Sequence, residues 1–409
     1  MKVKFDISIR EKLVVNFALL CITSILILGF YIYNSSYNAI LSRTTNQLTS
    51  IREFKKRQIE SFFDDRIRDM QLLQKSFGAV DGFDEFEHVN HQLLSVLLKS
   101  NYYSFVSFYS ENQKCVYILK NDTSKMFQWN KRCDSISFFA EQLKQVVDSR
   151  VTITDFATFD GEKVLLVSLP FNNKQGAKMG ILSLAVSSKA VNSLVYVNTS
   201  LSGMGYSGES YIVGDDFVMR SMSRFDSNSV MLKKVQTQSA QHVFHDDKGV
   251  LVANDYRNIE VLSSFTRLKI PDLSWALLVE IDFKELIEPI VQIKNDILVI
   301  TSVISIIVLI LAFVISFKIT DPLVNLSKAA LEIANGKYGN TLAIKSSDEI
   351  GELTDSFNTM SVRIKEQTKE LLEREKRLDR FYEATKDGII IHDSTQPLLI
   401  NKGLAVLTQ

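Results

Sequence analysis

The sequence has no net charge and lacks the motifs of common enzymes. Lys+Arg and Asp+Glu each number 47 among 409 residues, and there are only 5 histidines and 3 cysteines. Without a basic surplus or an acidic tail, we expect no nucleic-acid partner. The chain contains no Walker loop, no H-E-x-x-H pair and no recognisable Ser-His-Asp triad. We therefore expect no catalytic residue, no metal site and no cofactor within it.

Charge is also missing from two long apolar runs, residues 13–33 and 297–317. A helix needs about 20 apolar residues to cross the hydrocarbon core of a bilayer, and buried helices of soluble proteins rarely run that long without a charge. We predict a transmembrane helix in each run. No A-x-A cleavage site follows the first run, which is longer than the apolar part of a signal peptide, so we interpret it as an uncleaved anchor.

Basic residues on the flanks of these runs predict the orientation of the chain. Four of them precede the first span: Lys2, Lys4, Arg10 and Lys12. The positive-inside rule then places residues 1–12 and the C-terminus in the cytoplasm and residues 34–296 outside. We expect a two-span protein of the cell inner membrane with both termini in the cytoplasm.

Cysteine is scarce in the exported region. Cys21 lies in the first predicted span, whereas Cys115 and Cys133 lie outside the membrane, where a disulfide can persist. The sequence cannot place their Cα atoms within bridging distance. A disulfide and two free thiols therefore both remain open.

The exported region changes its pattern along the chain. Residues 35–76 have apolar side chains at three- and four-residue steps without Pro or Gly, which predicts one long helix. Two groups of strands should follow, with a helix at 135–149 in the first group. The predicted strands are 103–109, 115–119, 151–156, 163–170 and 179–186, then 210–213, 217–220, 250–255, 260–268 and 274–281. We expect an α+β fold with two PAS-like lobes on one helix, a membrane-distal lobe at about 77–195 and a proximal lobe at about 196–285.

The second lobe carries the block GMGYSGESYIVGDD at 203–216, followed by MRSMSR at 219–224 and the closing strand WALLVEID at 275–282. This block resembles the double Cache sensors of bacterial receptors, and the resemblance extends over about 34–290. It implies a small extracytoplasmic ligand that is bound in the membrane-distal lobe.

Candidate ligand-binding residues are aromatic and charged side chains of the distal lobe: Tyr103, Tyr117, Trp129, Arg132, Asp155 and Asp160. An arginine can grip a carboxylate with two bonds, an aspartate can accept from an ammonium group, and an aromatic ring can stack on a cation. Together they would suit an amino acid or an amine. The alternative for any one of them is a solvated loop charge or a core aromatic residue.

Two further motifs have simpler interpretations. The spacing Gly203-x-Gly205-x-x-Gly208 fits a dinucleotide-binding expression, but a strand follows it rather than a helix, so we predict a tight turn. His242 and His245 could hold a metal, but nothing nearby completes a site. We predict a polar loop there.

The region after the second span resembles a HAMP domain over 318–366, and we place the whole domain at 318–371. The resemblance is carried by two amphipathic helices and a connector at 337–347. The first helix should start near Pro322 and end at Asn335-Gly336, a C-cap signal, and Asp348, Glu349, Ile350 and Gly351 open the second. The resemblance implies a parallel four-helix coiled coil in a homodimer that relays the signal. An a/d seam supports this: Ile350, Leu353, Phe357, Met360 and Ile364. The alternative is a plain membrane-proximal coiled coil.

Residues 372–409 are predicted to form a linker helix and the opening of a PAS domain, with strands at 387–392 and 397–400 and a helix that begins at Asn401. A PAS domain needs about 100 residues to close its sheet, so we expect the chain to be a fragment. In such receptors HAMP and PAS lead into a diguanylate cyclase, which the form of the PAS opening slightly favours, or into a histidine kinase. A chemotaxis transducer is the third possibility, although a long methylated hairpin would then follow HAMP. The sequence thus predicts an α+β membrane receptor, without catalysis of its own, that senses a small ligand.

Overall fold

The computed structural model describes residues 9–77, 92–110, 114–120, 129–133, 136–146, 150–172, 177–195, 204–385, 388–392 and 397–400. The chain divides into two compact units. One is Ile32–Lys294, and the other comprises Met1–Tyr31 and Asn295–Gln409. After the roles predicted for them from the sequence, we call the first the sensory unit and the second the membrane-HAMP unit.

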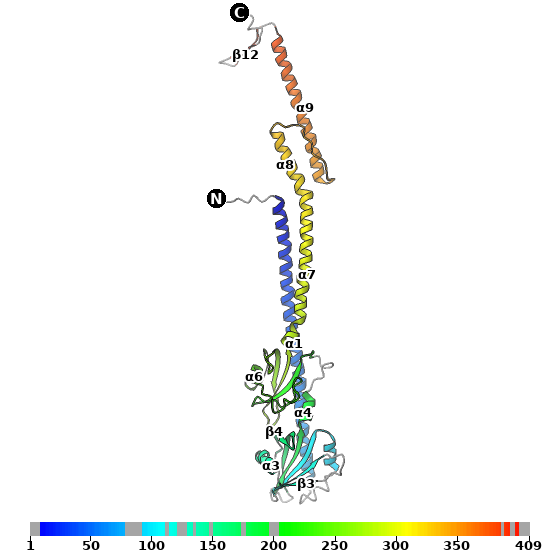
Figure 1. Cartoon of the computed structure of the whole chain (residues 1–409), viewed down its shortest axis with the longest axis vertical. Coiled ribbons are helices and arrows are strands. Elements are labelled where there is room, and N and C mark those ends of the chain that lie inside the picture. Colours follow the sequence, from blue (N-terminus) through cyan, green and yellow to red (C-terminus); the bar gives the residue numbers. More distant parts are fainter. Residues whose placement is uncertain are drawn as a thin grey trace. The chain divides into compact units, whose positions relative to one another are not determined.

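The sensory unit is built on the long helix α1, Ile9–Phe77, which has no interruption, as the spacing predicted. Its buried residues Ile59, Phe63 and Met70 belong to one apolar cluster that also contains residues of both sheets. Figure 1 shows the two sheets following one another beside this helix. We call the face of each sheet whose side chains belong to this cluster the inner face, and the opposite face the outer face.

The distal sheet is fully antiparallel, with strand order β3-β2-β1-β6-β5-β4. Its strands are β1 Tyr103–Ser110, β2 Cys115–Lys120, β3 Trp129–Arg132, β4 Thr152–Phe159, β5 Glu162–Asn172 and β6 Lys178–Ser187. A short helix, α3 (Ile136–Gln142), and a 3₁₀ turn, η1 (Leu143–Gln145), contribute Phe139 and Leu143 to the apolar cluster on the outer face.

Two sequence expectations for this lobe were wrong. The helix predicted over 135–149 ends early, because Val146 leaves the helical conformation and its N–H closes a tight turn onto Leu143. Strand β3 was not predicted at all, because its four residues WNKR have no alternation of apolar and polar side chains.

The proximal sheet has four antiparallel strands in the order β7-β10-β9-β8. They are β7 Glu209–Gly214, β8 Lys248–Asn254, β9 Glu260–Arg267 and β10 Trp275–Asp282, and α4 (Ser188–Val195) precedes them in the chain. The strand predicted at 217–220 makes only isolated bridges, at Val218 and Met219.

The polar loop predicted around His242 is instead helix α6, Gln238–Asp246. Thr237 caps its first turn by accepting a hydrogen bond from the N–H of Ala240. Ala240 and Val243 are buried against the outer face of the proximal sheet. Three-residue spacing of small apolar side chains was the signal for a helix, and the surrounding polar residues obscured it.

The membrane-HAMP unit contains the two apolar stretches. The helices long and apolar enough to cross a membrane lie within Val14–Ser76 and Phe283–Ala334, and most side chains of their apolar windows are exposed. Gly29 lets the two helices approach closely, since a Cβ atom there would lie 3.0 Å from Ile297. Small residues at such contacts are typical of packed membrane helices.

Helix α7 (Phe283–Ile315) continues through a π-helical turn, η2 (Ser316–Thr320), into α8 (Asp321–Ala334). Pro322 therefore stands at the start of α8, as predicted, but the chain runs into it without a break. Proline lacks an N–H and its ring crowds the carbonyl four residues earlier, and a π turn relieves both problems.

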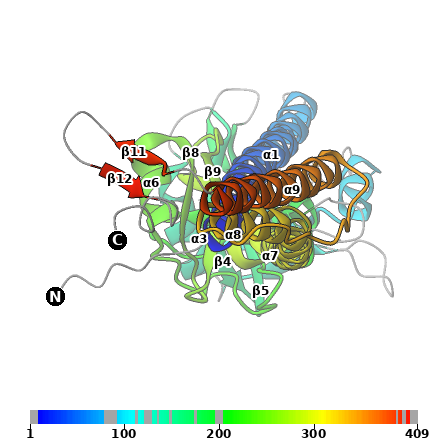
Figure 2. The same cartoon turned by 90° about the horizontal axis from the view of Figure 1, so that it is seen from above.

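Helix α9, Glu349–Ala384, lies beside α8 in Figures 1 and 2. Gly336, with φ of +86°, ends α8 as the Asn-Gly pair predicted. Beyond α9, β11 (Ile390–His392) and β12 (Pro397–Ile400) form an antiparallel pair in the region of the predicted PAS opening. The helix expected from Asn401 lies outside the described residues.

Candidate functional site

The six predicted ligand-binding residues occupy three separate places in the sensory unit. Tyr103 is buried on the inner face, where its hydroxyl donates a hydrogen bond to Asp69 of α1. The guanidinium of Arg66 lies 5.4 Å from the centre of the Tyr103 ring. Burial raises the pKa of Tyr103, so the phenol stays neutral. This residue joins the distal sheet to the long helix.

Tyr117 and Trp129 also lie on the inner face, packed against the apolar cluster around α1. The ammonium group of Lys131 lies 5.5 Å from the ring centre of Tyr117. Three of the six predicted residues thus share the face that contacts α1.

Arg132 of β3 bonds Asp160 in the turn between β4 and β5, although β3 and β4 are at opposite edges of the distal sheet. The two bonds from Arg132 Nη1 to the Asp160 carboxylate measure 2.9 and 3.1 Å, and Lys120 Nζ lies 3.0 Å from the same group. The hydrogen bond from Lys120, then the charges of Lys120 and Arg132, lower the pKa of Asp160. The sequence identified the arginine and the aspartate but could not show that they pair.

Cys115 and Cys133 are joined by a disulfide, with Cα atoms 4.3 Å apart. They stand opposite one another next to the paired residues Val116 and Arg132 of β2 and β3. The bond closes the open end of this hairpin.

Asp155 lies at the junction of the two lobes. Its carboxylate accepts from Arg220 Nε at 2.9 and 3.0 Å and from the indole N–H of Trp275 at 3.2 Å. Arg220 is itself buried and also donates to Asp216 and to the carbonyl of Val218. A residue predicted to contact a ligand therefore links the distal sheet to the proximal one.

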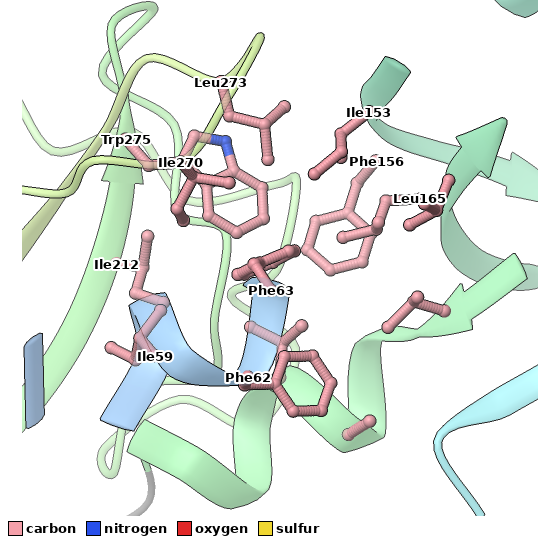
Figure 3. Close-up of a cluster of buried hydrophobic side chains, with 14 of the residues drawn as sticks. Ile59, Phe62, Phe63, Ile153, Phe156, Leu165, Ile212, Ile270, Leu273 and Trp275 are labelled. Atoms are coloured by element: carbon pink, nitrogen blue, oxygen red, sulfur yellow. The ribbon is translucent and has the colours of Figure 1, made fainter. Parts of the chain in front are cut away.

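Apolar side chains surround this junction. Figure 3 shows Phe63 of α1, Phe156 of the distal lobe and Trp275 of the proximal lobe in one cluster. The Phe156 and Trp275 rings are stacked with centres 5.6 Å apart, and Phe63 meets the indole edge-on at 5.7 Å. The lobes thus share a core with the helix that carries them.

A row of hydroxyl groups crosses the outer face of the distal sheet, and sequence reasoning missed it. Thr152, Ser168, Ser183 and Ser107 stand in one register across β4, β5, β6 and β1, and all four are buried. Ser168 and Ser183 pair through their hydroxyls at 2.8 Å. The Ser107 hydroxyl has no hydrogen-bond partner among the described residues. The signal was a serine or threonine between large apolar residues in each strand, and only strand register aligned the four.

Buried carboxylates form a second polar group, on the outer face of the proximal sheet. Glu209 of β7 stands directly opposite Glu280 of β10, and Asp255 follows β8. One oxygen of each lies within 4.8 Å of the other two. By spacing alone the three could hold a cation. Their oxygens, however, already accept hydrogen bonds from tyrosine and serine hydroxyls, Arg257 and backbone N–H groups.

Burial has a strong effect on this carboxylate cluster. Desolvation, with a further contribution from the charge of Glu209, raises the pKa of Glu280 to about 8. Desolvation also raises the pKa of Glu209. His242 and His245 lie elsewhere, on α6, where each bonds the exposed Asp246 through Nδ1.

The proximal sheet is tied to the first turn of α7 by a carboxylate. Glu285 accepts hydrogen bonds from the N–H groups of Tyr206 and Ser207, both at 2.9 Å. Gly205 precedes these two residues in a tight turn. Glycine suits this position because its φ is +69° and because a Cβ atom there would clash with the Glu285 carboxylate. The glycine spacing therefore serves a turn at Gly205, while Gly203 lies outside the described residues.

The predicted relay residues occupy the helix starts of the HAMP region. Asp348 caps α9 by accepting from the N–H groups of Ile350 at 3.0 Å and Gly351 at 3.3 Å. A hydrogen bond from the Ser346 side chain chiefly lowers the pKa of Asp348. Gly351 must be small, since a Cβ atom there would lie 2.0 Å from the carbonyl oxygen of Ser346. Glu349 is exposed in the first turn of α9, where its negative charge interacts favourably with the positive end of the helix dipole.

Comparison with known proteins identifies this region. Residues 314–366 match the HAMP domain family. The sensor protein kinase WalK of Staphylococcus saprophyticus is 31% identical over 115 residues, which are 28% of this chain and 19% of that protein. WalK of Staphylococcus aureus is 32% identical over 113 residues, 27% of this chain and 19% of that protein. The matches thus span about a fifth of the length of these relatives.

The sensory unit is similar in arrangement to solved receptor domains. The periplasmic sensory domain of the Campylobacter jejuni chemoreceptor Tlp1 has 12% identity and a TM-score of 0.47, over 61% of this chain and 99% of that one. The ligand-binding domain of the Pseudomonas aeruginosa amino acid chemoreceptor PctC, in complex with GABA, has 18% identity and a TM-score of 0.43, over 58% and 100%. These scores are below 0.5, so the ligands of those receptors say nothing about the ligand of this chain.

The HAMP match covers the region where the structure places the two packed amphipathic helices. Two helices long and apolar enough to cross a membrane and a two-sheet module on one long helix complete the arrangement. Residues 314–366 are therefore a HAMP domain, and the same chain carries a two-sheet module and two helices that are long and apolar enough to cross a membrane.

Proposed function

We propose that this chain is a transmembrane sensory receptor with a Cache-like sensory unit and a HAMP signalling relay. It lies in the inner membrane with both termini in the cytoplasm, and its distal lobe binds a small extracytoplasmic ligand. The observation that carries the proposal is the row of hydroxyls on the outer face of the distal sheet. Buried polar atoms normally have partners, and the Ser107 hydroxyl has none among the described residues. A ligand that accepts a hydrogen bond from the Ser107 hydroxyl, or donates one to it, would supply the missing partner.

The surroundings of the row suit a small molecule with both polar and apolar parts. Phe105 and Phe139 flank the row, while Ser168 and Ser183 supply hydroxyls. Arg132 stands on the same face as Val116, near the sheet edge, where it could meet a carboxylate. An amino acid or an amine therefore remains the class to test first. Helix α3 covers this face, so binding requires it to move outward.

A path for the signal starts on the strand that ends the row. Thr152 and Asp155 are both on β4, and Asp155 bonds Arg220 and Trp275 of the proximal lobe. Strand β10 begins at Trp275 and runs directly into α7. We infer that a shift of β4 on ligand binding reaches α7 through this junction.

The HAMP relay needs a second copy of the chain. Thr354, Phe357 and Ser361 of α9 are buried against α8 and the connector, whereas the seam residues Leu353 and Met360 are about half exposed. Apolar a/d side chains of this kind are covered when helices pair in a four-helix bundle. We therefore propose a homodimer in which the HAMP helices change their packing in response to α7.

The ligand proposal is tested by thermal unfolding of residues 32–294, which form a compact unit with their own cores. We expect one or more compounds in a panel of amino acids, amines and carboxylates to raise the melting temperature. Ser107→Ala should abolish most of that increase without destabilising the free protein, because the hydroxyl has no partner to lose. Ser227→Ala, at an exposed proximal loop position, is the matched control. The proposal fails if no compound stabilises, or if Ser107→Ala responds like Ser227→Ala.

The output of the complete receptor is a second proposal. The likeness to WalK, a sensor protein kinase by name, favours a histidine kinase over a diguanylate cyclase or a chemotaxis transducer. Residues 1–409 would then supply sensing and relay without catalysis. Coding sequence downstream of residue 409 tests this: an H-box with an ATPase domain supports it, and a GG-[DE]-E-F block contradicts it.

A further inference from the structure

The buried carboxylates of the proximal lobe have no role in the function proposed above. Glu209 and Glu280 are 1% and 2% exposed, on neighbouring strands and in direct register. Like charges directly opposite one another destabilise a sheet, and burial makes the repulsion stronger. The side chain of Asp255 is fully buried beside them. Such an arrangement needs a compensating charge or a bound proton.

The groups that donate hydrogen bonds to the two glutamates are neutral hydroxyls and one backbone N–H. Glu280 accepts from Tyr211 on its own side of the sheet and from Ser263 on β9, at 2.9 and 2.7 Å. Glu209 accepts from Tyr256 and Ser223, both at 2.8 Å. The charged groups around the cluster are Asp255 and Arg257 after β8, Asp282 at the end of β10, Arg224 beside Glu209, and Lys233 over the Tyr256 ring.

The nearby positive charge does not neutralise Glu209 or Glu280, because it is bonded to other carboxylates. Arg257 bonds Asp255 at 2.6 Å and Asp282 at 2.6 Å, so its charge is shared between those two carboxylates. Lys233 lies 5.4 Å from the Tyr256 ring and is held by the ring rather than by an acid. Glu209 and Glu280 thus have hydroxyl donors but no bonded cation among the described residues. A proton on one of them removes the repulsion.

We propose that the Glu209–Glu280 pair is a proton-sensing site, which makes extracytoplasmic pH a second stimulus of this receptor. Glu280 is the group that releases its proton to solvent as the pH rises, because its pKa is raised to about 8 by burial and by the charge of Glu209. The site is independent of the ligand row, which lies on the other sheet.

Position along the chain connects this site to the second membrane helix. Glu280 is three residues before the first residue of α7, and Asp282 between them bonds Arg257. The N–H of Asp282 donates to the hydroxyl of Ser207, whose own N–H donates to Glu285 of α7. When Glu280 becomes charged, repulsion from Glu209 and from Asp255 acts on the end of β10. We expect the first turns of α7 to loosen.

Fluorescence of the full chain in phosphatidylcholine nanodiscs tests the site. The chain has two tryptophans, so Trp129→Phe leaves Trp275, on the same strand as Glu280, as the reporter. We expect a pH transition near 8 that Glu280→Gln abolishes. Glu209→Gln should move it to lower pH, because the repulsion from the Glu209 charge is gone. Glu260→Gln, at an exposed position on β9, should leave it unchanged.

Several results would overturn the proposal. These are the absence of a transition, a transition that survives in Glu280→Gln, or one that Glu209→Gln moves to higher pH. A transition that requires added Ca²⁺ and disappears with EDTA would make the cluster a cation site instead. Hydrogen exchange of residues 283–294, corrected for the intrinsic effect of pH, tests the coupling. At pH values above the transition, the exchange rate should increase in the protein that carries only Trp129→Phe. It should not increase when Glu280→Gln is added, and equal exchange in both proteins would refute the link to α7.

Discussion

Arg220 at the lobe junction offers the most direct test of how the sensory unit is held together. It is 4% exposed and donates five hydrogen-bonding contacts to Asp155, Asp216 and the Val218 carbonyl, over distances of 2.8 to 3.0 Å. Replacing it with methionine retains an apolar stem of similar length but removes every donor. The two carboxylates then lose their partner.

The size of the effect depends on how well water can replace the guanidinium. A hydrogen bond to a charged group contributes about 1.5–3 kcal/mol, and breaking a fully buried pair costs about 3–5 kcal/mol. The side chains of Asp155 and Asp216 are 37% and 48% exposed, so solvent screens them and the cost falls below that limit. We expect Arg220→Met to lower the free energy of unfolding by roughly 2–3 kcal/mol. Asp155→Asn should cost about 1 kcal/mol, because Arg220 keeps Asp216 and an amide oxygen can still accept from Trp275.

Urea unfolding of residues 32–294 measures both variants and the double variant. Because the two side chains touch, their effects should not add, and we expect a coupling energy of about 1 kcal/mol. An Arg220→Met variant that loses less than about 1 kcal/mol, or a strictly additive cycle, would refute the account of this junction. Lys234→Met, on the same lobe at an exposed position, is the control for loss of a positive charge.

Three further predictions concern other parts of the chain. Phe63→Ala should destabilise the sensory unit by about 3–5 kcal/mol in the same urea assay, because the ring is fully buried against Trp275, and a loss below 1 kcal/mol would contradict the shared core. The unfolding free energy of wild-type protein should fall by several kcal/mol as pH rises from about 4.5 to about 8, since Glu280 holds its proton there only when folded, and Glu280→Gln should flatten this dependence. Gly351→Val should disrupt the start of α9, because its Cβ would meet the Ser346 carbonyl; fewer homodimer crosslinks between cysteines introduced at Met360 are expected, and unchanged crosslinking would argue against the relay geometry.

Local patterns in the sequence were sufficient for the elements whose stability is local. The two apolar spans, the long helix α1 and most strands follow from residue type and period alone. The cap at Asp348 and the helix end at Gly336 were also predictable, because each satisfies backbone groups within its own turn. Where local signals were weak, as in α6 and β3, the tertiary structure decided.

What the sequence could not determine was which residues meet across the sheets. Strand order and register depend on the turns and on the burial of whole faces, so a side chain's neighbour can come from any distance along the chain. Asp155 meets Arg220, 65 residues away, only because the two lobes share the core around α1. The hydroxyl row and the opposed glutamates have the same origin. The sequence by itself determined two helices that are apolar enough to cross a membrane and the HAMP helices, because residue type and period are local properties. Only the tertiary structure decided which polar groups are buried together, because exclusion of water depends on how the sheets pack.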